Sequence, residues 1–421
     1  MKPRRSAIAI AALLLASTAF ADDTGIPWVE GAGVPLPDGV RSVIALREDA
    51  PIEAGPRGDA KRRGSAMAGA RLPLYAARRG PGCEGRWLMV GPLAWICQAN
   101  VDLSDAPPLG ARETPRDEPD GLPFAYFFVG RDGSAAYSRF ELADDAEPEM
   151  EMQPGFGVAI VEQRTRAGSA TYGRTHHGQW IPMRDLVPVR PFAFHGEELK
   201  EGTLDVGWVL DDRTTVYAKP DGVSRASGTR ARFEVVHVLE EQGKGDRLMV
   251  RVGDAQWLRA KDIRRPHRIA PPKEVLKGER WIDVELGQQT LVAYEGERPV
   301  FATLVSTGKG AQGTERATPI GIHRIWVKLR SSTMDNLEDE RATSNYAIED
   351  VPYVQFFSKG VALHGAFWHH GFGRVRSHGC VNLAPLDAQR VFAFTGPKLP
   401  AGWTASLPSD VEAGSVVQIR P

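Results

Sequence analysis

The chain has 421 residues, of which 42% are hydrophobic and 25% are charged, and its formal net charge is −1. The length allows about two to four domains, and the composition is ordinary for a globular protein. The near-neutral charge excludes a generally cationic surface. The sequence has no basic stretch with interleaved aromatic residues and no phosphate-binding glycine-rich loop, so we expect no nucleic-acid partner.

Residues 1–21 have the features of a secretory signal peptide. Basic residues at positions 2, 4 and 5 precede an apolar run over 7–16, and Ala19 and Ala21 place small residues where a signal peptidase cleaves. An uncleaved N-terminal membrane anchor is the alternative. No other segment approaches the roughly 20 uninterrupted apolar residues of a membrane span. We therefore predict an exported, soluble protein of the periplasm or cell wall, with no membrane span in its mature form.

The segment 22–106 is expected to be a β module that contains two of the three cysteines, Cys83 and Cys97. Each lies beside an apolar, strand-like run, and their proximity in sequence makes them the natural pair for a local disulfide. Such a bond would stabilise the module by about 2 to 4 kcal/mol, and two free buried thiols are the alternative. The remaining cysteine, Cys380, would then be an unpaired thiol in an oxidising compartment, which indicates reactivity.

The short basic run Lys61–Arg63 stands in a stretch rich in Gly, Ala and Pro, and we expect it to be a solvated loop. A second stretch rich in Pro, Asp, Arg and Gly, over 107–123, reads as a linker. Further β modules are expected over 124–196 and 203–268.

One pattern occurs three times in this part of the chain: Trp, an aliphatic residue, three further residues, Asp or Asn, and another aliphatic residue. Its copies begin at Trp95, Trp180 and Trp257. Repetition at constant spacing indicates one supersecondary unit used three times. The segments resemble bacterial SH3-like domains, which end in a Trp-containing strand and a short turn. A single irregular β domain with coincidental Trp spacing is the alternative.

Two histidine pairs, His176–His177 and His369–His370, raise the question of a metal site. Neither pair has a cysteine or carboxylate at a recognisable ligand spacing. We therefore interpret both pairs as surface histidines and expect no metal and no organic cofactor.

The segment 279–421 is expected to be a separate domain of mainly β structure. Apolar runs over 281–286, 290–294 and 300–305 predict short strands of a β-sandwich-like core. A helix is predicted to begin at Pro385, with apolar residues on one face. The fold class is therefore mainly β, with a few short helices in the C-terminal domain and small barrel-like modules before it.

Between these strands and the helix lies the segment 377–382, which reads Ser-His-Gly-Cys-Val-Asn, and His364 precedes it. A thiol is a usable nucleophile near neutral pH when an imidazole takes its proton, and a glycine beside it lets the backbone approach a developing oxyanion. A buried cysteine beside two surface histidines is the alternative. We expect the segment to lie on a loop held by a rigid scaffold.

This pattern resembles the active-site signature of the L,D-transpeptidases, the YkuD-type domain that cross-links peptidoglycan. That signature is a His, a spacer, then Ser or Thr, His, Gly, Cys, a hydrophobic residue and Asn. The segment 318–321, which reads Thr-Pro-Ile-Gly, is similar to a turn of the family, and Tyr346 and Trp368 have counterparts there. The spacer between His364 and Ser377 is shorter than the family's.

The resemblance implies a role for each matching residue. Cys380 would be the nucleophile that attacks a peptidoglycan stem peptide, and His364 the general base, held by the backbone carbonyl of Gly365. Backbone N–H groups of Gly379 and Cys380 would bind the oxyanion, with help from Tyr346. The supporting residues would hold the loop and line the site: Trp368, Ser377, His378 and Asn382.

The implied product is a 3-3 cross-link, formed through a cysteine thioester, and the implied inhibitors are carbapenems. Two classes of alternative remain. Water as acceptor would give an L,D-carboxypeptidase or endopeptidase, and a protein lysine would give an anchoring enzyme. A wall-binding scaffold with an inert catalytic domain is the other class.

Overall fold

The computed structural model describes residues 33–109, 120–143, 147–166, 170–190, 193–338 and 345–421. The predicted signal peptide lies outside these residues. The protein is mainly β, as the sequence predicts, and the described residues contain one α-helix together with short 3-10 helices. No helix within the described ranges is long and apolar enough to cross a membrane.

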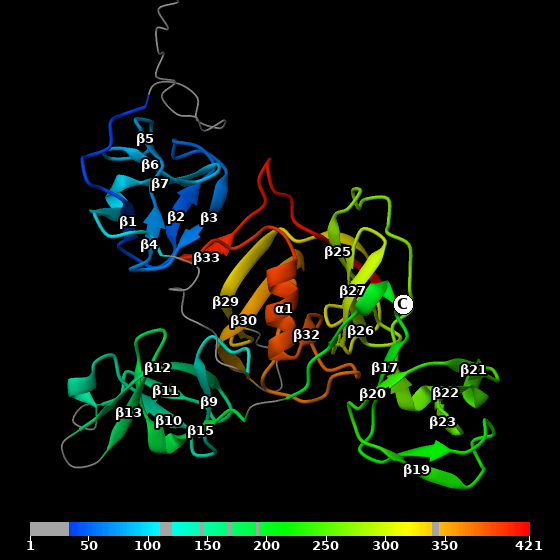
Figure 1. Ribbon diagram of the computed structural model, residues 1–421. Helices are drawn as coiled ribbons and strands as arrows, with labels where there is room; N and C mark the ends of the chain where they lie inside the picture. The colour runs from blue at the N-terminus through cyan, green and yellow to red at the C-terminus, as the bar shows by residue number, and fades with distance from the viewer. Residues whose placement is uncertain (1–32, 110–119, 144–146, 167–169, 191–192, 339–344) are drawn as a thin grey trace, which may run out of the picture.

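The first module (blue to cyan in Figure 1) consists of eight strands. They are β1 (Ser42–Ala45), β2 (Ala50–Glu53), β3 (Arg62–Ala66), β4 (Arg71–Pro73), β5 (Ala76–Arg78), β6 (Trp87–Gly91), β7 (Ala94–Cys97) and β8 (Val101–Ser104). They form the ladders β4-β1-β8 and β3-β2-β7-β6-β5. The disulfide expected between Cys83 and Cys97 is present, beside a small cluster that includes Trp87 and Trp95.

The third module also has eight strands. They are β17 (Val206–Val209), β18 (Thr214–Tyr217), β19 (Ala226–Arg230), β20 (Val235–His237), β21 (Glu240–Gln242), β22 (Met249–Gly253), β23 (Gln256–Arg259) and β24 (Ile263–Arg264). Their ladders, β20-β17-β24 and β19-β18-β23-β22-β21, have the same order as those of the first module. The two modules therefore share one topology, although their sequences differ.

The second module follows a variant of this plan. Its strands are β9 (Ala125–Val129), β10 (Ser134–Ala136), β11 (Met150–Met152), β12 (Gly157–Thr165), β13 (Thr171–Thr175), β14 (Trp180–Pro182) and β15 (Leu186–Pro188). The long β12 pairs with β9 through its first half and with β13 through its second half. It thereby occupies the places that β4 and β5 fill in the first module.

The repeated Trp pattern forms the same local structure in all three modules. Each copy is a strand, a one-turn 3-10 helix and another strand. The 3-10 helices are η1 (Gln98–Asn100), η3 (Met183–Asp185) and η6 (Ala260–Asp262). The tryptophans at the start of the pattern are all buried, because each strand packs its indole into the module. The prediction of a threefold supersecondary unit is correct at this level.

The C-terminal domain is built on a sheet of order β16-β27-β26-β25-β34-β28. Its strands are β16 (Glu197–Glu198), β25 (Arg280–Glu285), β26 (Thr290–Glu295), β27 (Arg298–Leu304), β28 (Gly321–Arg324) and β34 (Val416–Arg420). The three predicted strands are present within one or two residues at each end. Facing this sheet lie β29 (Val327–Asp335), β30 (Ala347–Ser358), β31 (Val361–Gly365) and β32 (Val381–Leu383).

The helix α1 (Pro385–Phe394) begins at the predicted proline and packs against β30 and β31. Ala388 and Val391 are fully buried in the domain's core. The ammonium group of buried Lys328 donates a hydrogen bond of 3.1 Å to the carbonyl of Thr395, just past the end of the helix. Burial lowers the pKa of Lys328 to about 7, and its hydrogen bond satisfies a carbonyl that has no partner within the helix.

One strand of the C-terminal domain, β33 (Trp403–Ser406), completes the first module. It pairs with β29 on one side and with β3 on the other, and Figure 1 shows it beside the blue strands. Trp403 is 3% exposed and belongs to the first module's hydrophobic core. A Cβ on Gly64 would lie 2.3 Å from the carbonyl oxygen of Ala405, so this close approach requires glycine.

The prediction that Lys61–Arg63 is a solvated loop holds for Lys61, but Arg62 and Arg63 belong to a strand, and only Arg62 of these two is exposed. Arg63 lies in β3, is 6% exposed, and donates a hydrogen bond of 3.0 Å to the hydroxyl of Ser406. It also pairs with Glu412 at 3.4 Å. These partners lie more than 340 residues away in sequence, so no local pattern could indicate them.

We predict that Trp403→Ala destabilises the protein by about 3 to 5 kcal/mol, because it removes a buried indole from a core shared by two parts of the chain. Differential scanning calorimetry should show a lower temperature for the transition that includes the first module. Trp326→Ala is the matched control, since Trp326 is 48% exposed, and it should cost about 1 kcal/mol or less. Equal effects of the two substitutions would contradict the shared core.

Candidate active site

Strand pairing brings the predicted catalytic residues together. β31 and β32 are parallel neighbours, with Leu363 opposite Val381 and His364 opposite Asn382. Residues at the same level of neighbouring strands point to the same face of a sheet. Cys380 stands one residue before β32, so its side chain emerges on the same face as those of His364 and Asn382. The expectation that all of 377–382 is loop is therefore wrong at its end, where Val381 and Asn382 belong to a strand.

The imidazole of His364 is held in one tautomer by the next residue of the chain. His364 is 2% exposed, and its Nδ1 lies 3.0 Å from the carbonyl oxygen of Gly365. A carbonyl can only accept, so Nδ1 carries the proton and Nε2 keeps its lone pair. Burial lowers the pKa of His364 to about 4. At neutral pH the ring is therefore an uncharged base, and Trp368 stacks on it at 5.7 Å.

Cys380 is the one free cysteine among the described residues, and it is partly buried. Burial raises the pKa of its thiol, although the backbone of Ala362 opposes this effect. The thiol is therefore protonated at neutral pH. The sulfur lies 3.9 Å from the carbonyl oxygen of Gly360. A neutral thiol and a neutral imidazole on the same face of paired strands fit general-base activation better than a preformed ion pair.

The hydroxyl groups of Ser377 and Thr318 hold the loop before Cys380 through hydrogen bonds. The hydroxyl of Ser377 donates to the carbonyl of Cys380 at 2.5 Å and accepts from the N–H of Gly379 at 3.1 Å. The carbonyl of Gly379 accepts a hydrogen bond of 2.6 Å from Thr318, in the predicted Thr-Pro turn. Gly379 has φ of +132°, a conformation that side chains rarely adopt.

These bonds change one expectation for the oxyanion site. The N–H of Gly379 was expected to be a donor to substrate, but in the structure it is bonded to Ser377. Burial raises the pKa of Tyr346. Cys380 lies close enough that a negative charge on its sulfur would raise the pKa of Tyr346 further. Its hydroxyl is therefore protonated at neutral pH and can donate. The ring of Tyr346 also stacks on that of His378 at 5.9 Å.

His378 is exposed, and its pKa is lowered by partial burial and then by the charges of Arg316 and Lys309. His364, in contrast, is buried on the strand next to the nucleophile. This difference in environment favours His364 over His378 as the residue that takes the thiol proton.

No local pattern indicates that His369 is buried beside Asn382. It was expected at the surface, but it is 7% exposed, and its Nε2 lies 2.9 Å from Nδ2 of Asn382. Burial and neighbouring cations lower the pKa of His369 to about 3, so it is neutral. His369 thus connects the spacer after His364 with the strand that follows the nucleophile. Its neighbour His370 is exposed, as expected.

A polar pocket of about 450 Å³ opens on the other side of His369, between the third module and the spacer. Three arginines and two aspartates contribute to its wall, and the ion pair of Arg374 with Asp211 spans it. Arg232 donates a hydrogen bond of 2.7 Å to the carbonyl of His370. The complete lining is Leu210, Asp211, Asp212, Arg232, His369, His370, Gly371, Arg374 and Arg376.

The second module packs directly against the wall of the site. The rings of Tyr126 and Phe367 lie 4.2 Å apart, and the hydroxyl of Tyr126 donates a hydrogen bond of 2.5 Å to the carbonyl of Asp350. The same hydrophobic cluster extends to Trp368 and Cys380. The second module therefore supports the segment between His364 and Cys380.

Residues 279–419 match the family model of YkuD, described as the L,D-transpeptidase catalytic domain. The chain has a YkuD L,D-transpeptidase catalytic domain. This result confirms the family that the sequence resemblance indicated. No curated protein has a significant match to the chain.

Several solved L,D-transpeptidase structures are similar to parts of the chain. The Ldtfm–avibactam carbamoyl enzyme is 21% identical over 34% of this chain and 49% of its own length, with a TM-score of 0.25. The chain thus spans about half the length of that enzyme. The ertapenem-acylated catalytic domain from Enterococcus faecium is 24% identical over 31% of this chain and 97% of its own, with a TM-score of 0.23. An L,D-transpeptidase from Mycobacterium smegmatis is 14% identical over 63% and 99%, with a TM-score of 0.26.

We predict that iodoacetamide labels one thiol per native chain, at Cys380, because Cys83 and Cys97 are joined. The labelling rate should rise with pH with a midpoint above about 8.5, the usual value for a free thiol, since burial raises the pKa of Cys380. Mass spectrometry of samples quenched across the pH range measures this. A midpoint near 7 or below would indicate a thiolate–imidazolium pair and contradict the neutral pair. Cys380→Ser should take up no label.

Proposed function

We propose that the protein is a peptidoglycan L,D-transpeptidase that forms 3-3 cross-links through a cysteine thioester. The observation that carries this proposal is the pairing of β31 with β32 inside the YkuD domain. It sets a buried imidazole of fixed tautomer beside the strand that the free thiol of Cys380 precedes. A nucleophile, a base and a group that orients the base are the parts that acyl transfer requires.

In the first step, Nε2 of His364 accepts the Cys380 proton while the sulfur attacks the carbonyl carbon of the third residue of a donor stem tetrapeptide. The tetrahedral intermediate then expels D-Ala, whose amine takes the proton from His364, and a thioester remains. In the second step, the side-chain amine of an acceptor stem attacks the thioester. That amine loses its proton to His364, and the thiol leaves and recovers it.

The negative charge on the intermediate requires donors other than the amide of Gly379, which is bonded to Ser377. We assign this role to the backbone N–H of Cys380 and to the hydroxyl of Tyr346. A protonated phenol near the sulfur can donate when the charge develops, and donors placed in advance lower the barrier most.

We further propose the following domain division: a signal peptide over 1–21, a β module over 22–106, a linker over 107–123, β modules over 124–196 and 203–268, and the catalytic domain over 279–421. We propose export to the periplasm or cell wall, because peptidoglycan, the proposed substrate, is found only there. The shared ladder order of the first and third modules supports the proposed SH3-like nature of these modules.

We predict that the purified protein converts disaccharide-tetrapeptides into 3-3 linked dimers, and that Cys380→Ser and His364→Ala each lower the rate by orders of magnitude. The double variant should lose little more than either single variant, because the two residues act as a unit. His378→Ala should retain most of the activity. Liquid chromatography with mass spectrometry separates the dimers from the tripeptides that hydrolysis would give.

In the same assay, hydrolysis alone would identify a carboxypeptidase, and lysine-linked protein adducts would identify an anchoring enzyme. Wild-type protein that forms no product, and that takes up no carbapenem on Cys380, would support the inert scaffold and contradict the proposal. For an active enzyme we expect one carbapenem adduct per chain on Cys380, since the lactam carbonyl takes the place of the stem carbonyl.

We also propose that the arginine-lined pocket behind His369 receives a carboxylate of the stem peptide. Its arginines exceed its aspartates by one, and guanidinium groups bind carboxylates in a bidentate manner. The pocket's wall residue His369 contacts Asn382, which is paired with His364, so a peptide held there would reach the site.

We predict that Arg232→Ala raises KM for acidic stem peptides about tenfold and changes kcat little, because a charged hydrogen bond contributes about 1.5 to 3 kcal/mol. Stem peptides with amidated carboxylates should show no such difference between wild type and variant. Arg225→Ala, at an exposed site of the same module outside the pocket, is the control. An equal loss on acidic and amidated peptides would contradict carboxylate binding.

A further inference from the structure

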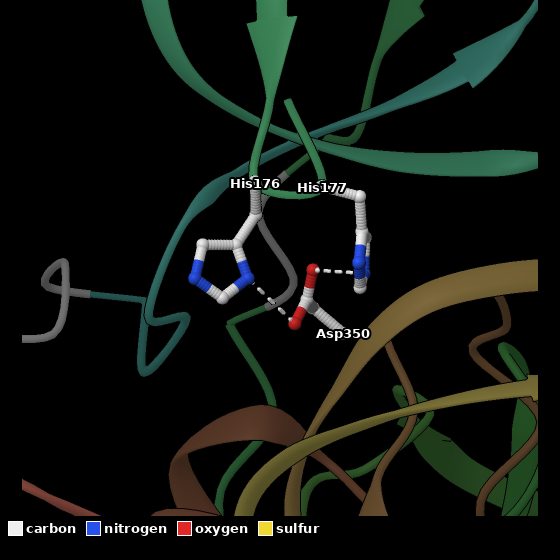
Figure 2. Close-up of side chains that lie close together, drawn as sticks. All are labelled: His176, His177 and Asp350. Carbon is white, nitrogen blue, oxygen red and sulfur yellow. Dashed lines mark hydrogen bonds and ion pairs between the residues drawn. The ribbon is translucent and has the colours of Figure 1, made fainter. Parts of the chain in front are cut away.

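Two neighbouring histidines of the second module enclose one carboxylate of the catalytic domain. His176 and His177 follow β13, and Asp350 lies in β30. Figure 2 shows both rings directed at the two oxygens of Asp350. Nδ1 of His176 lies 3.0 Å from Oδ1, and Nε2 of His177 lies 3.3 Å from Oδ2. Both histidines are exposed, as expected, but the expectation that they have no carboxylate partner is wrong.

We propose that His176, His177 and Asp350 bind a divalent transition-metal ion, with Zn²⁺ as the first candidate. The ion would join the second module to the catalytic domain. The three ligand atoms lie within 4.8 Å of one another. Two imidazole nitrogens and one carboxylate oxygen are a ligand set that Zn²⁺ commonly accepts, with water in the fourth position.

The distances between these atoms suit a tetrahedral ion. With zinc–ligand bonds of about 2.0 to 2.2 Å, neighbouring ligands of a tetrahedron lie about 3.3 to 3.6 Å apart. The two nitrogen–oxygen distances, 3.0 Å to Oδ1 and 3.3 Å to Oδ2, are close to this range. The side chain of Asp350 is 5% exposed, whereas those of the histidines are 34% and 48% exposed. The cluster is thus anchored on a buried carboxylate and open to solvent on the histidine side.

The carboxylate is oriented as metal-binding carboxylates are. The hydroxyl of Ser331 donates a hydrogen bond of 2.8 Å to Oδ1 of Asp350. Such outer contacts fix the ligand's direction and strengthen metal binding. Asp350 also has φ of +51°, an uncommon conformation for a residue with a side chain, which directs its carboxylate toward the second module.

A second carboxyl group, that of Glu349, lies beside the cluster, and burial raises its pKa to about 7. Glu349 interacts electrostatically with His177 and Asp350, and its Oε2 is buried without a hydrogen-bond partner among the described residues. A buried carboxylate oxygen that lacks a donor is costly in isolation. A divalent ion next to it would compensate that cost.

Zinc binding is tested on the full mature chain with Cys380→Ser as background, so that the free thiol offers no competing ligand and the disulfide stays intact. Isothermal titration with ZnCl₂ at pH 7.5 should give one ion per chain. His176→Ala and His177→Ala should each weaken binding by at least about tenfold, since each removes a ligand. These histidines are partly exposed, so both variants should fold.

His237→Ala is the matched control, because His237 forms a similar exposed pair with Asp205 at 3.4 Å but offers no third ligand. It should leave the affinity and the stoichiometry unchanged. Co²⁺ in place of Zn²⁺ should give visible absorption of a tetrahedral site, which the double variant His176→Ala/His177→Ala lacks. The proposal is overturned if no stoichiometric ion binds, or if the double variant binds the ion as tightly as its parent. This result is independent of transpeptidase activity.

Discussion

The parallel pairing of β31 with β32 is the contact on which the candidate site depends. It brings His364 level with Asn382 and places Cys380 two residues before Asn382, on the same face, although a spacer separates the two segments. A slip of this register by one residue would turn Cys380 away from the face of the imidazole. The surrounding structure resists such a slip. Ser377 and Thr318 bind the loop on one side, and β31 is buried against α1 on the other.

Burial determines the protonation states of the two side chains that this register brings to one face. An exposed histidine and an exposed thiol would differ little from their free forms. In the core, the imidazole is kept neutral and the thiol protonated. In the proposed mechanism, the proton therefore passes between two uncharged groups. The carbonyl of Gly365 keeps the proton on Nδ1 and leaves Nε2 as the nitrogen that can accept one. A backbone atom serves here, so the identity of the side chain at position 365 is not critical to the tautomer.

Local signals predicted local structure well. The strands of the C-terminal domain, the helix at Pro385 and the threefold Trp pattern follow from periodicity and turn residues, and the motif around Cys380 indicated the family. Features that depend on distant partners were missed. Arg63 is buried against Ser406, His369 is buried against Asn382, and His176 meets Asp350 across 174 residues. A single sequence carries no signal for such pairs, because each residue type is common at surfaces.

The position of β33 has a consequence for any fragment of this protein. A catalytic domain cut at residue 279 would keep Trp403 and the hydrogen-bonding edge of β33, but it would lose β3, which covers both. An uncovered strand edge beside a large apolar side chain is a template for intermolecular pairing. The isolated domain would therefore be prone to self-association, and its behaviour in solution would not represent that of the intact chain.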